Sequence, residues 1–288
     1  MRFMMGYGYM GTTRFAQNDL ARLSYEVSGP EDAPVVVLLH ATMASRSTLA
    51  PLQARLEANY RVLLPDARGH GASSALMKRD LSSTDLANDI VAILEAEGIS
   101  STVHLVGHGQ GAIAALELAH WRPDRITSLV LIEPDAISVL EGEGDEEVVA
   151  LREAARKANR QAADDSYKGL ADKALNGYLD RRWGTGWRER LTRPRLAAVR
   201  RSMPGLAASL DALERFRILP EHLEAIPFPV LIVTGKNTAA VEKLIADRLA
   251  GWIPGADVFQ ADSLPGGEPF GGEGSGIAGQ IVEWILEN

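Results

Sequence analysis

The sequence predicts an α/β protein, with a mainly parallel central sheet flanked by helices and an α-helical segment inserted late in the chain. Apolar runs of strand length alternate with helix-like segments as far as about Pro134, and this order is typical of right-handed βαβ crossovers in a parallel sheet. Between residues 136 and 226 no run resembles a strand, and Ala, Leu, Arg and Glu recur at helical spacing. We therefore expect a core made of residues 1–135 and 227–288, and a helical cap made of residues 136–226.

The strands are predicted from runs of β-branched residues and leucine that are bounded by turn residues. The continuous apolar run at 33–40 fits a central strand that is buried on both faces. In chain order, the predicted strands are 20–29, 33–40, a strand that begins at 61, 102–108, 126–134, 228–235 and 256–261.

The core helices are predicted from helical spacing and from residues that start or stop a helix. The segment 82–99 begins with serines and has Gly98 near its end, and the segment 111–123 stops at Pro123. Two further helices are predicted at 239–252 and 276–288.

Composition excludes several classes of function. The chain has 288 residues, a net charge of -8 and no cysteine, which rules out thiol nucleophiles, disulfides and cysteine metal sites and disfavours nucleic acid as a partner. No apolar run approaches the roughly 20 residues of a membrane helix, and glycines interrupt the start before a signal-peptide core forms. We expect a cytoplasmic protein with no membrane partner. No motif indicates a metal or a cofactor, so none is predicted.

A strand, a tight turn and a helix are predicted over residues 103–117, and the turn reads Gly-His-Gly-Gln-Gly with Gly109 at its centre. Together with three other segments it resembles the α/β-hydrolase superfamily, in the members that carry a helical cap after the sixth strand. Residues 38–45 resemble the oxyanion loop of that family, with Ala41 where glycine is usual. Residues 65–74 resemble its D-x-R-G-H-G-x-S loop, and residues 229–238 resemble the strand and loop that carry its catalytic acid.

The resemblance implies a nucleophile, an acid and a histidine in that chain order. These positions map to Gly109, Thr238 and Ser263, and no histidine follows His222. None of the three residues supplies the group that the family uses. We therefore expect a pseudo-hydrolase or non-canonical member that lacks the triad and does not use the covalent serine mechanism.

The resemblance also implies an oxyanion hole made by two backbone N–H groups, at Gln110 and Thr42, which do not depend on side-chain identity. We expect a pocket between core and cap that binds a small carbonyl or carboxylate compound. The leading hypothesis is ligand binding, or a non-covalent and non-hydrolytic reaction such as a cyclisation, an elimination or an isomerisation. The expected pocket residues are Thr42, Met43, Gly109, Gln110, Thr238 and Ser263, with Trp183 and Trp187 from the cap.

Two alternatives stay open. The first is an active ester, C–C or epoxide-type hydrolase with relocated catalytic residues, for which His40, His108 and Glu133 are candidates. Glu133 and Asp135 follow the strand at 126–134, where some members of the family carry the acid. The second alternative is a non-catalytic protein that serves a structural role or binds a partner.

The cap is rich in arginine. Its segment 181–201 contains eight arginines and one acidic residue. These side chains either face solvent or, for one or two of them, reach into the pocket and hold an acidic ligand, because arginine binds carboxylates bidentately. The glycine-rich loop at 265–276 is expected to border the same pocket.

Overall fold

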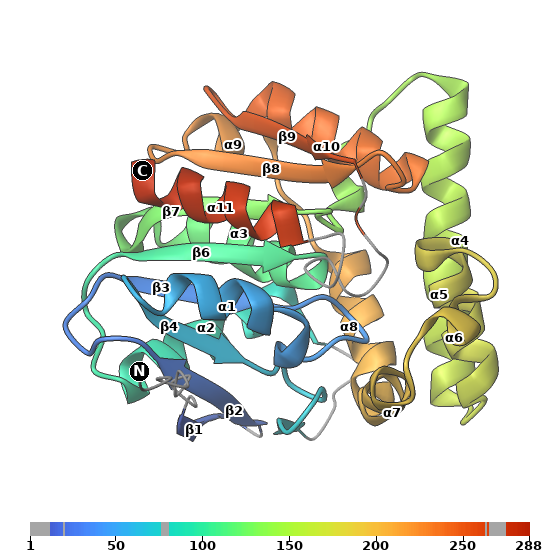
Figure 1. Ribbon diagram of the computed structural model, residues 1–288. Helices are drawn as coiled ribbons and strands as arrows, with labels where there is room; N and C mark the ends of the chain where they lie inside the picture. The colour runs from blue at the N-terminus through green and yellow to red at the C-terminus, as the bar shows by residue number, and fades with distance from the viewer. Residues whose placement is uncertain (1–11, 20, 76–80, 263, 265–274) are drawn as a thin grey trace, which may run out of the picture.

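A nine-stranded sheet lies at the centre of the molecule (Figure 1). The computed structural model describes residues 12–19, 21–75, 81–262, 264 and 275–288. The strand order is β1-β2-β4-β3-β6-β7-β8-β9, and β5 pairs with β2 beside this path. The strands from β4 to β9 along the path run parallel, whereas β1, β2 and β5 pair antiparallel. The strands are β1 (Thr12–Asn18), β2 (Ala21–Ser28), β3 (Val35–Leu39), β4 (Arg61–Pro65), β5 (Ser74–Ala75), β6 (Val103–His108), β7 (Ile126–Ile132), β8 (Val230–Gly235) and β9 (Asp257–Ala261).

Helices cover both faces of the sheet, because the central strands are apolar on both. In β3, Val35 and Val37 belong to the core beneath α2, α3 and α10, whereas Val36 and Leu38 belong to the core beneath α1 and α11. The predicted α/β architecture is therefore confirmed. The core helices are α1 (Ala50–Leu56), α2 (Ser83–Ala96), α3 (Gln110–Trp121), α10 (Ala240–Trp252) and α11 (Ser275–Glu287), with short 3-10 segments at η1 (Arg46–Thr48), η2 (Pro123–Arg125) and η3 (Ile137–Leu140).

A helical cap lies between β7 and β8, at the edge of the sheet toward which the arrows of β6 and β8 point (Figure 1). Residues 133–229 are all described and contain no strand. The carboxyl ends of parallel strands are where ligand sites form in open α/β sheets. The cap helices are α4 (Glu146–Tyr167), α5 (Ala171–Trp183), α6 (Trp187–Arg190), α7 (Arg193–Arg201), α8 (Met203–Arg215) and α9 (Pro220–Glu224).

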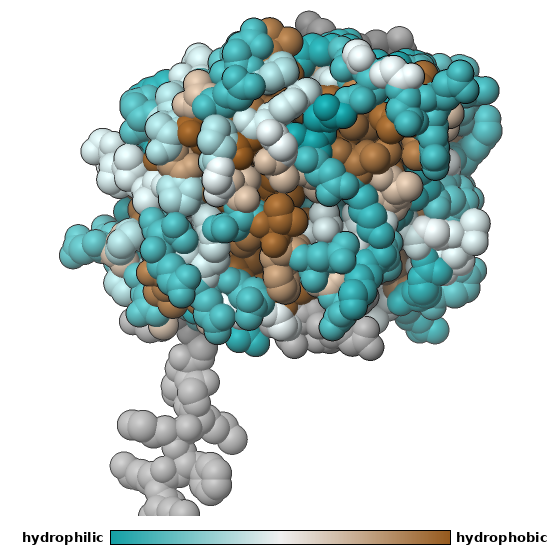
Figure 2. Space-filling model, turned by 90° about the horizontal axis from the view of Figure 1, so that it is seen from above, coloured by the Kyte–Doolittle hydropathy of each residue, from teal (hydrophilic) through white to brown (hydrophobic). Residues whose placement is uncertain are grey.

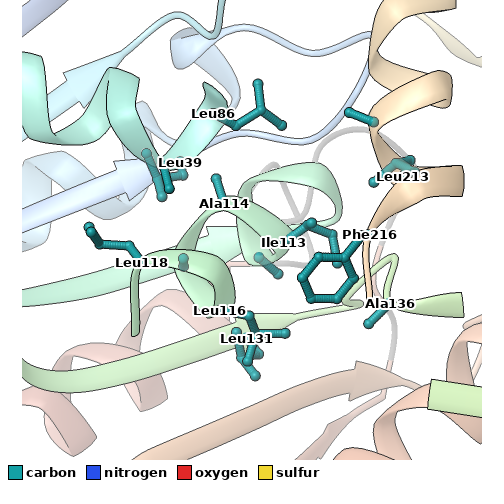
Figure 3. Close-up of a cluster of buried hydrophobic side chains, with 14 of the residues drawn as sticks. Leu39, Leu86, Ile113, Ala114, Leu116, Leu118, Leu131, Ala136, Leu213 and Phe216 are labelled. Carbon is teal, nitrogen blue, oxygen red and sulfur yellow. The ribbon is translucent and has the colours of Figure 1, made fainter. Parts of the chain in front are cut away.

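Buried apolar side chains join the cap to the core. Leu213 in α8 and Phe216 just beyond it point toward Ile113 in α3 and toward Ala136 (Figure 3). All four side chains belong to one continuous core cluster. This packing holds the cap next to the turn that precedes α3.

Hydrophilic side chains cover most of the face seen from above, with smaller hydrophobic areas among them (Figure 2). Within the described ranges, no helix is long and apolar enough to cross a membrane.

Candidate functional site

The turn between β6 and α3 has the sharp geometry that the glycine pattern predicts. Gly109 has φ 54° and ψ -111°, a conformation that costs a residue with a side chain on the order of 1–3 kcal/mol. A Cβ on Gly107 would lie 2.5 Å from the carbonyl oxygen of Gly111, and one on Gly111 would lie 2.3 Å from that of Leu39. Glycine is therefore required at 107 by the close approach of α3 to β6, and at 111 by the close approach of α3 to β3.

The side chain of Asp135 lies beside the centre of this turn. An ideal Cβ on Gly109 would lie 3.2 Å from Asp135 Oδ2 and 3.0 Å from the Cβ of Ala41. The Asp135 side chain is 6% exposed, and its Oδ2 has no hydrogen-bond partner among the residues that the structure describes. A buried carboxylate oxygen thus stands next to the point where the family's nucleophile would begin.

Two arginines of the cap reach this carboxylate. In α5, Nη1 of Arg182 donates to Asp135 Oδ1 at 2.5 Å and to Glu242 Oε1 at 2.7 Å. Nη1 of the neighbouring Arg181 donates to the same Glu242 oxygen at 2.6 Å. The arginine-rich segment therefore does send side chains inward, where they pair with the protein's own carboxylates. The sequence analysis did not single out Glu242.

Burial and charge act on these groups in opposite directions. Burial raises the pKa of the Asp135 carboxyl; Arg182 opposes this rise and the negative charge of Glu242 adds to it. Burial also acts to raise the pKa of Glu242, but Arg182 and Arg181 outweigh it and the pKa falls below its usual range. The pKa of Asp135 is therefore raised, whereas that of Glu242 is lowered.

Glu133, Thr238 and His108 form a second polar group close to the turn. Thr238 Oγ1 donates to Glu133 Oε1 at 2.5 Å and accepts from the backbone N–H of Gly235 at 2.7 Å. His108 Nε2 lies 3.7 Å from Glu133 Oε2, and its buried Nδ1 has no partner within the described part of the chain. Burial acts to raise the pKa of Glu133, but His108, Arg182 and Thr238 together hold it below its usual range. Thr238, at the position mapped to the acid, therefore meets a carboxylate that comes from the end of β7.

His40 is held by the backbone through both ring nitrogens. Its Nε2 accepts from the N–H of Ala67 at 2.9 Å, so Nδ1 carries the proton and donates to the carbonyl oxygen of Ala41 at 2.8 Å. Burial lowers the pKa of His40. The ring thus fixes the two loops that follow β3 and β4, and neither nitrogen is open to a proton.

The residues expected to form the oxyanion hole lie side by side. Thr42 Oγ1 donates to Gln110 Oε1 at 3.0 Å, and both residues are buried. Gln110 is the first residue of α3, where backbone N–H groups lack a partner within the helix and the helix dipole favours negative charge. The N–H of the adjacent Met43 donates to His70 Nε2 at 3.3 Å. The loop after β3 is thereby fixed against the start of α3.

The two cap tryptophans contact each other. Their ring centroids are 6.0 Å apart with an interplanar angle of 78°. Trp187 is buried and Trp183 is partly buried against the same core cluster. Ser263 and residues 265–274 of the glycine-rich loop lie outside the described residues.

Comparison with curated proteins finds relatives that carry the names of hydrolases. The putative carbamate hydrolase RutD of Variovorax paradoxus is 41% identical over 111 residues, which is 38% of this chain and 41% of that protein. The 3-oxoadipate enol-lactonase 1 of Acinetobacter baylyi is 32% identical over 109 residues, which is 38% of this chain and 40% of that protein. The chain thus matches about two fifths of the length of these relatives.

Solved structures share the fold along nearly the whole chain. The esterase from Exiguobacterium antarcticum has a TM-score of 0.76 and 21% identity, covering 96% of this chain and 100% of that one. The enol-lactonase from Burkholderia xenovorans has a TM-score of 0.75 and 21% identity, covering 95% and 100%. At this identity the likeness establishes the fold.

The leading functional hypothesis from the sequence is wrong. It took Gly109, Thr238 and Ser263 at the triad positions, and the lack of a histidine after His222, as loss of hydrolysis, and it predicted a binding pocket or a non-hydrolytic reaction. Two of the curated relatives are instead named as a putative carbamate hydrolase and an enol-lactonase, which favours the alternative of an active hydrolase with relocated groups. The physical reason for the error is that residue spacing does not show which side chains the fold brings beside Gly109. Asp135, in the loop after β7, lies with its Oδ2 3.2 Å from where a Cβ on Gly109 would be.

The family is shown by the length of chain that a family model matches, in addition to the turn at Gly109. A model of the alpha/beta hydrolase family matches residues 36–267, a span that includes the oxyanion loop, the turn at Gly109, the cap and β8. The chain therefore belongs to the α/β hydrolase family.

Proposed function

We propose that the protein is an active hydrolase of a small carbonyl compound, such as an ester, a lactone or a carbamate, in which Asp135 acts as the general base. The observation that carries this proposal is the position of Asp135 Oδ2, 3.2 Å from where a Cβ on Gly109 would lie. Gly109 has no side chain with which to attack a carbonyl. A water molecule activated by the neighbouring carboxylate supplies the nucleophile instead.

In the proposed reaction, Asp135 Oδ2 removes a proton from water while the water oxygen bonds to the carbonyl carbon of the substrate. The carbonyl oxygen becomes an oxyanion, and the backbone N–H groups of Gln110 and Thr42 stabilise it. The bond from carbon to the leaving group then breaks. The proton on Asp135 passes to the leaving oxygen or nitrogen, and the carboxylate is restored.

The other candidate bases are less suitable. Both ring nitrogens of His40 are engaged with backbone groups. Glu133 accepts a hydrogen bond from Thr238, and its pKa is held below its usual range, whereas burial raises the pKa of Asp135. His108, with Glu133 beside it, is the one remaining histidine next to the turn that could take the role of base.

The names of the relatives support the class of substrate, because carbamates and lactones both contain the carbonyl group that this arrangement would polarise. Gly109, Gln110 and Asp135 are all buried.

The test is turnover of a panel of activated aryl esters, a lactone and an aryl carbamate by wild type and by Asp135→Asn. The asparagine side chain has nearly the same shape as aspartate but cannot accept the proton from water, so we expect kcat to fall by about 100-fold or more. Glu133→Gln is the matched control, since it removes the other carboxylate next to the turn. A large loss in Glu133→Gln with little loss in Asp135→Asn would instead assign the base to Glu133 or to His108 beside it. Circular dichroism checks that each variant folds.

A further inference from the structure

We infer that Arg182 and Glu242 are positioning residues that hold Asp135 with one oxygen anchored and the other directed at Gly109. The inference rests on the proposed function of Asp135. A single nitrogen, Nη1 of Arg182, bonds both Asp135 Oδ1 and Glu242 Oε1, at 2.5 Å and 2.7 Å. The three side chains are at most 6% exposed, so water does little to screen their charges.

The contact with Asp135 uses only one of its oxygens. An arginine that faces a lone carboxylate commonly forms two parallel bonds and engages both oxygens. Here Glu242 shares the same nitrogen, and Asp135 Oδ2 remains without a partner among the described residues. Glu242 thereby leaves one oxygen of Asp135 free to act as a base.

Glu242 also competes with Asp135 for the positive charge of Arg182. A buried carboxylate that has a whole guanidinium to itself becomes a much weaker base, because an opposite charge at this range lowers a carboxyl pKa by about 1–3 units. The charged and titratable groups that act on Asp135 are Arg181, Arg182 and Tyr178 from α5, Glu242 from α10 and His108 from β6. Among them Arg182 opposes the rise in the pKa of Asp135 and Glu242 supports it.

Removal of Glu242 and removal of Arg182 should therefore shift the pKa of Asp135 in opposite directions. Glu242→Gln leaves Arg182 to Asp135 alone, so the acidic limb of the plot of kcat/KM against pH should move to lower pH by about 1 unit. Arg182→Met removes the cation, so the limb should move to higher pH by a similar amount. Arg182→Lys keeps the charge and should restore most of the wild-type profile. Arg160→Met is the control, because Arg160 is a half-exposed cap arginine that pairs with Glu214.

A purely structural cluster predicts a different outcome. Loss of either partner would then reduce stability and kcat but leave the acidic limb in place, or move it the same way in both variants, and either result would overturn the inference. Titration of the Asp135 carboxyl by carbon NMR, with Asp135→Asn to assign its signal, gives the same comparison without any substrate. Opposite shifts in that titration with no hydrolysis would retain the positioning role and reject the proposed function. Hydrolysis without opposite shifts would retain the proposed function and reject the positioning role of Arg182 and Glu242.

Discussion

Asp135 occupies the neighbourhood that a nucleophile side chain would need, and Gly109 permits this. A Cβ at residue 109 would be 3.0 Å from Ala41 Cβ as well as 3.2 Å from Asp135 Oδ2, distances at which the neighbours must give way. Glycine also accepts φ 54° without steric cost. Glycine at the position of the family's nucleophile therefore relaxes the turn and leaves room for a carboxylate from the loop after β7.

The backbone N–H of Gln110 is one of the two proposed oxyanion donors, and a substitution can remove it. Proline is tolerated at the first position of a helix, which is the position of Gln110 in α3, so Gln110→Pro removes the backbone donor at small structural cost. We expect kcat for a good ester to fall by roughly 100- to 1,000-fold. Gln110→Ala keeps the N–H and loses only the bond from Thr42, so it should retain most of the activity. Equal losses in the two variants would mean that the side chain, not the N–H, matters.

Among the elements, α8 makes an unusually close contact with the core. A Cβ on Gly205 would lie 2.5 Å from Cε1 of His70 and 2.9 Å from the carbonyl oxygen of Gly69. Nearby, Ser202 Oγ donates to the carbonyl oxygen of Ala44 at 2.9 Å. The start of α8 is thus seated directly on the loops that follow β3 and β4, and a small residue is needed there.

Two substitutions of glycine by alanine should have opposite effects on stability. Gly205→Ala improves helix propensity but drives a methyl group into His70, and we expect a loss of about 1–3 kcal/mol in the free energy of unfolding. Gly177→Ala in α5 is the matched control, because its Cβ would meet nothing closer than Ala162 Cβ at 4.0 Å. It should add about 0.5–1 kcal/mol. Urea denaturation measures both, and a stabilised Gly205→Ala would show that α8 is not seated this closely.

The sequence predicts the strands that an apolar run marks and misses β1, which has no such run. β3, β6, β7 and β8 were predicted because every residue in them except Thr127 is buried, which gives them continuous apolar runs. β1 was missed because Ala16 is the one buried residue among its seven, so no apolar pattern marks it. In the site, the turn at Gly109 was predictable from local spacing. The bond between Arg182 and Glu242 was not, since 60 positions separate the two residues and only the packing of α5 on α10 brings them together.

Across the whole molecule, buried neutral histidines couple stability to pH. His70 is fully buried between the cap and the core loops, and burial lowers the pKa of its ring from 6.5 to about 4. Between these values the unfolded chain binds a proton that the folded protein does not. Stability must therefore fall as pH decreases through this window.

The magnitude can be measured by urea unfolding. From about pH 8 to about pH 5, His70 alone should remove roughly 2 kcal/mol from the free energy of unfolding. His70→Asn is less stable at high pH, because the N–H of Met43 loses its acceptor, but it should show a shallower decline with acidity. An equally steep decline in the variant would assign the pH dependence to other groups.

In the proposed reaction, Asp135 activates water for direct attack on a carbonyl. Its most direct test is a single turnover of an activated ester, with enzyme in excess, in water enriched in the heavy isotope of oxygen. Mass spectrometry of product and protein then follows the label in wild type and in Asp135→Asn. We expect one labelled oxygen in the product acid, no acyl group on the protein, and a rate about 100-fold or more above that of the variant. An acyl adduct, an unlabelled product, or a wild-type rate no faster than that of Asp135→Asn would contradict the account.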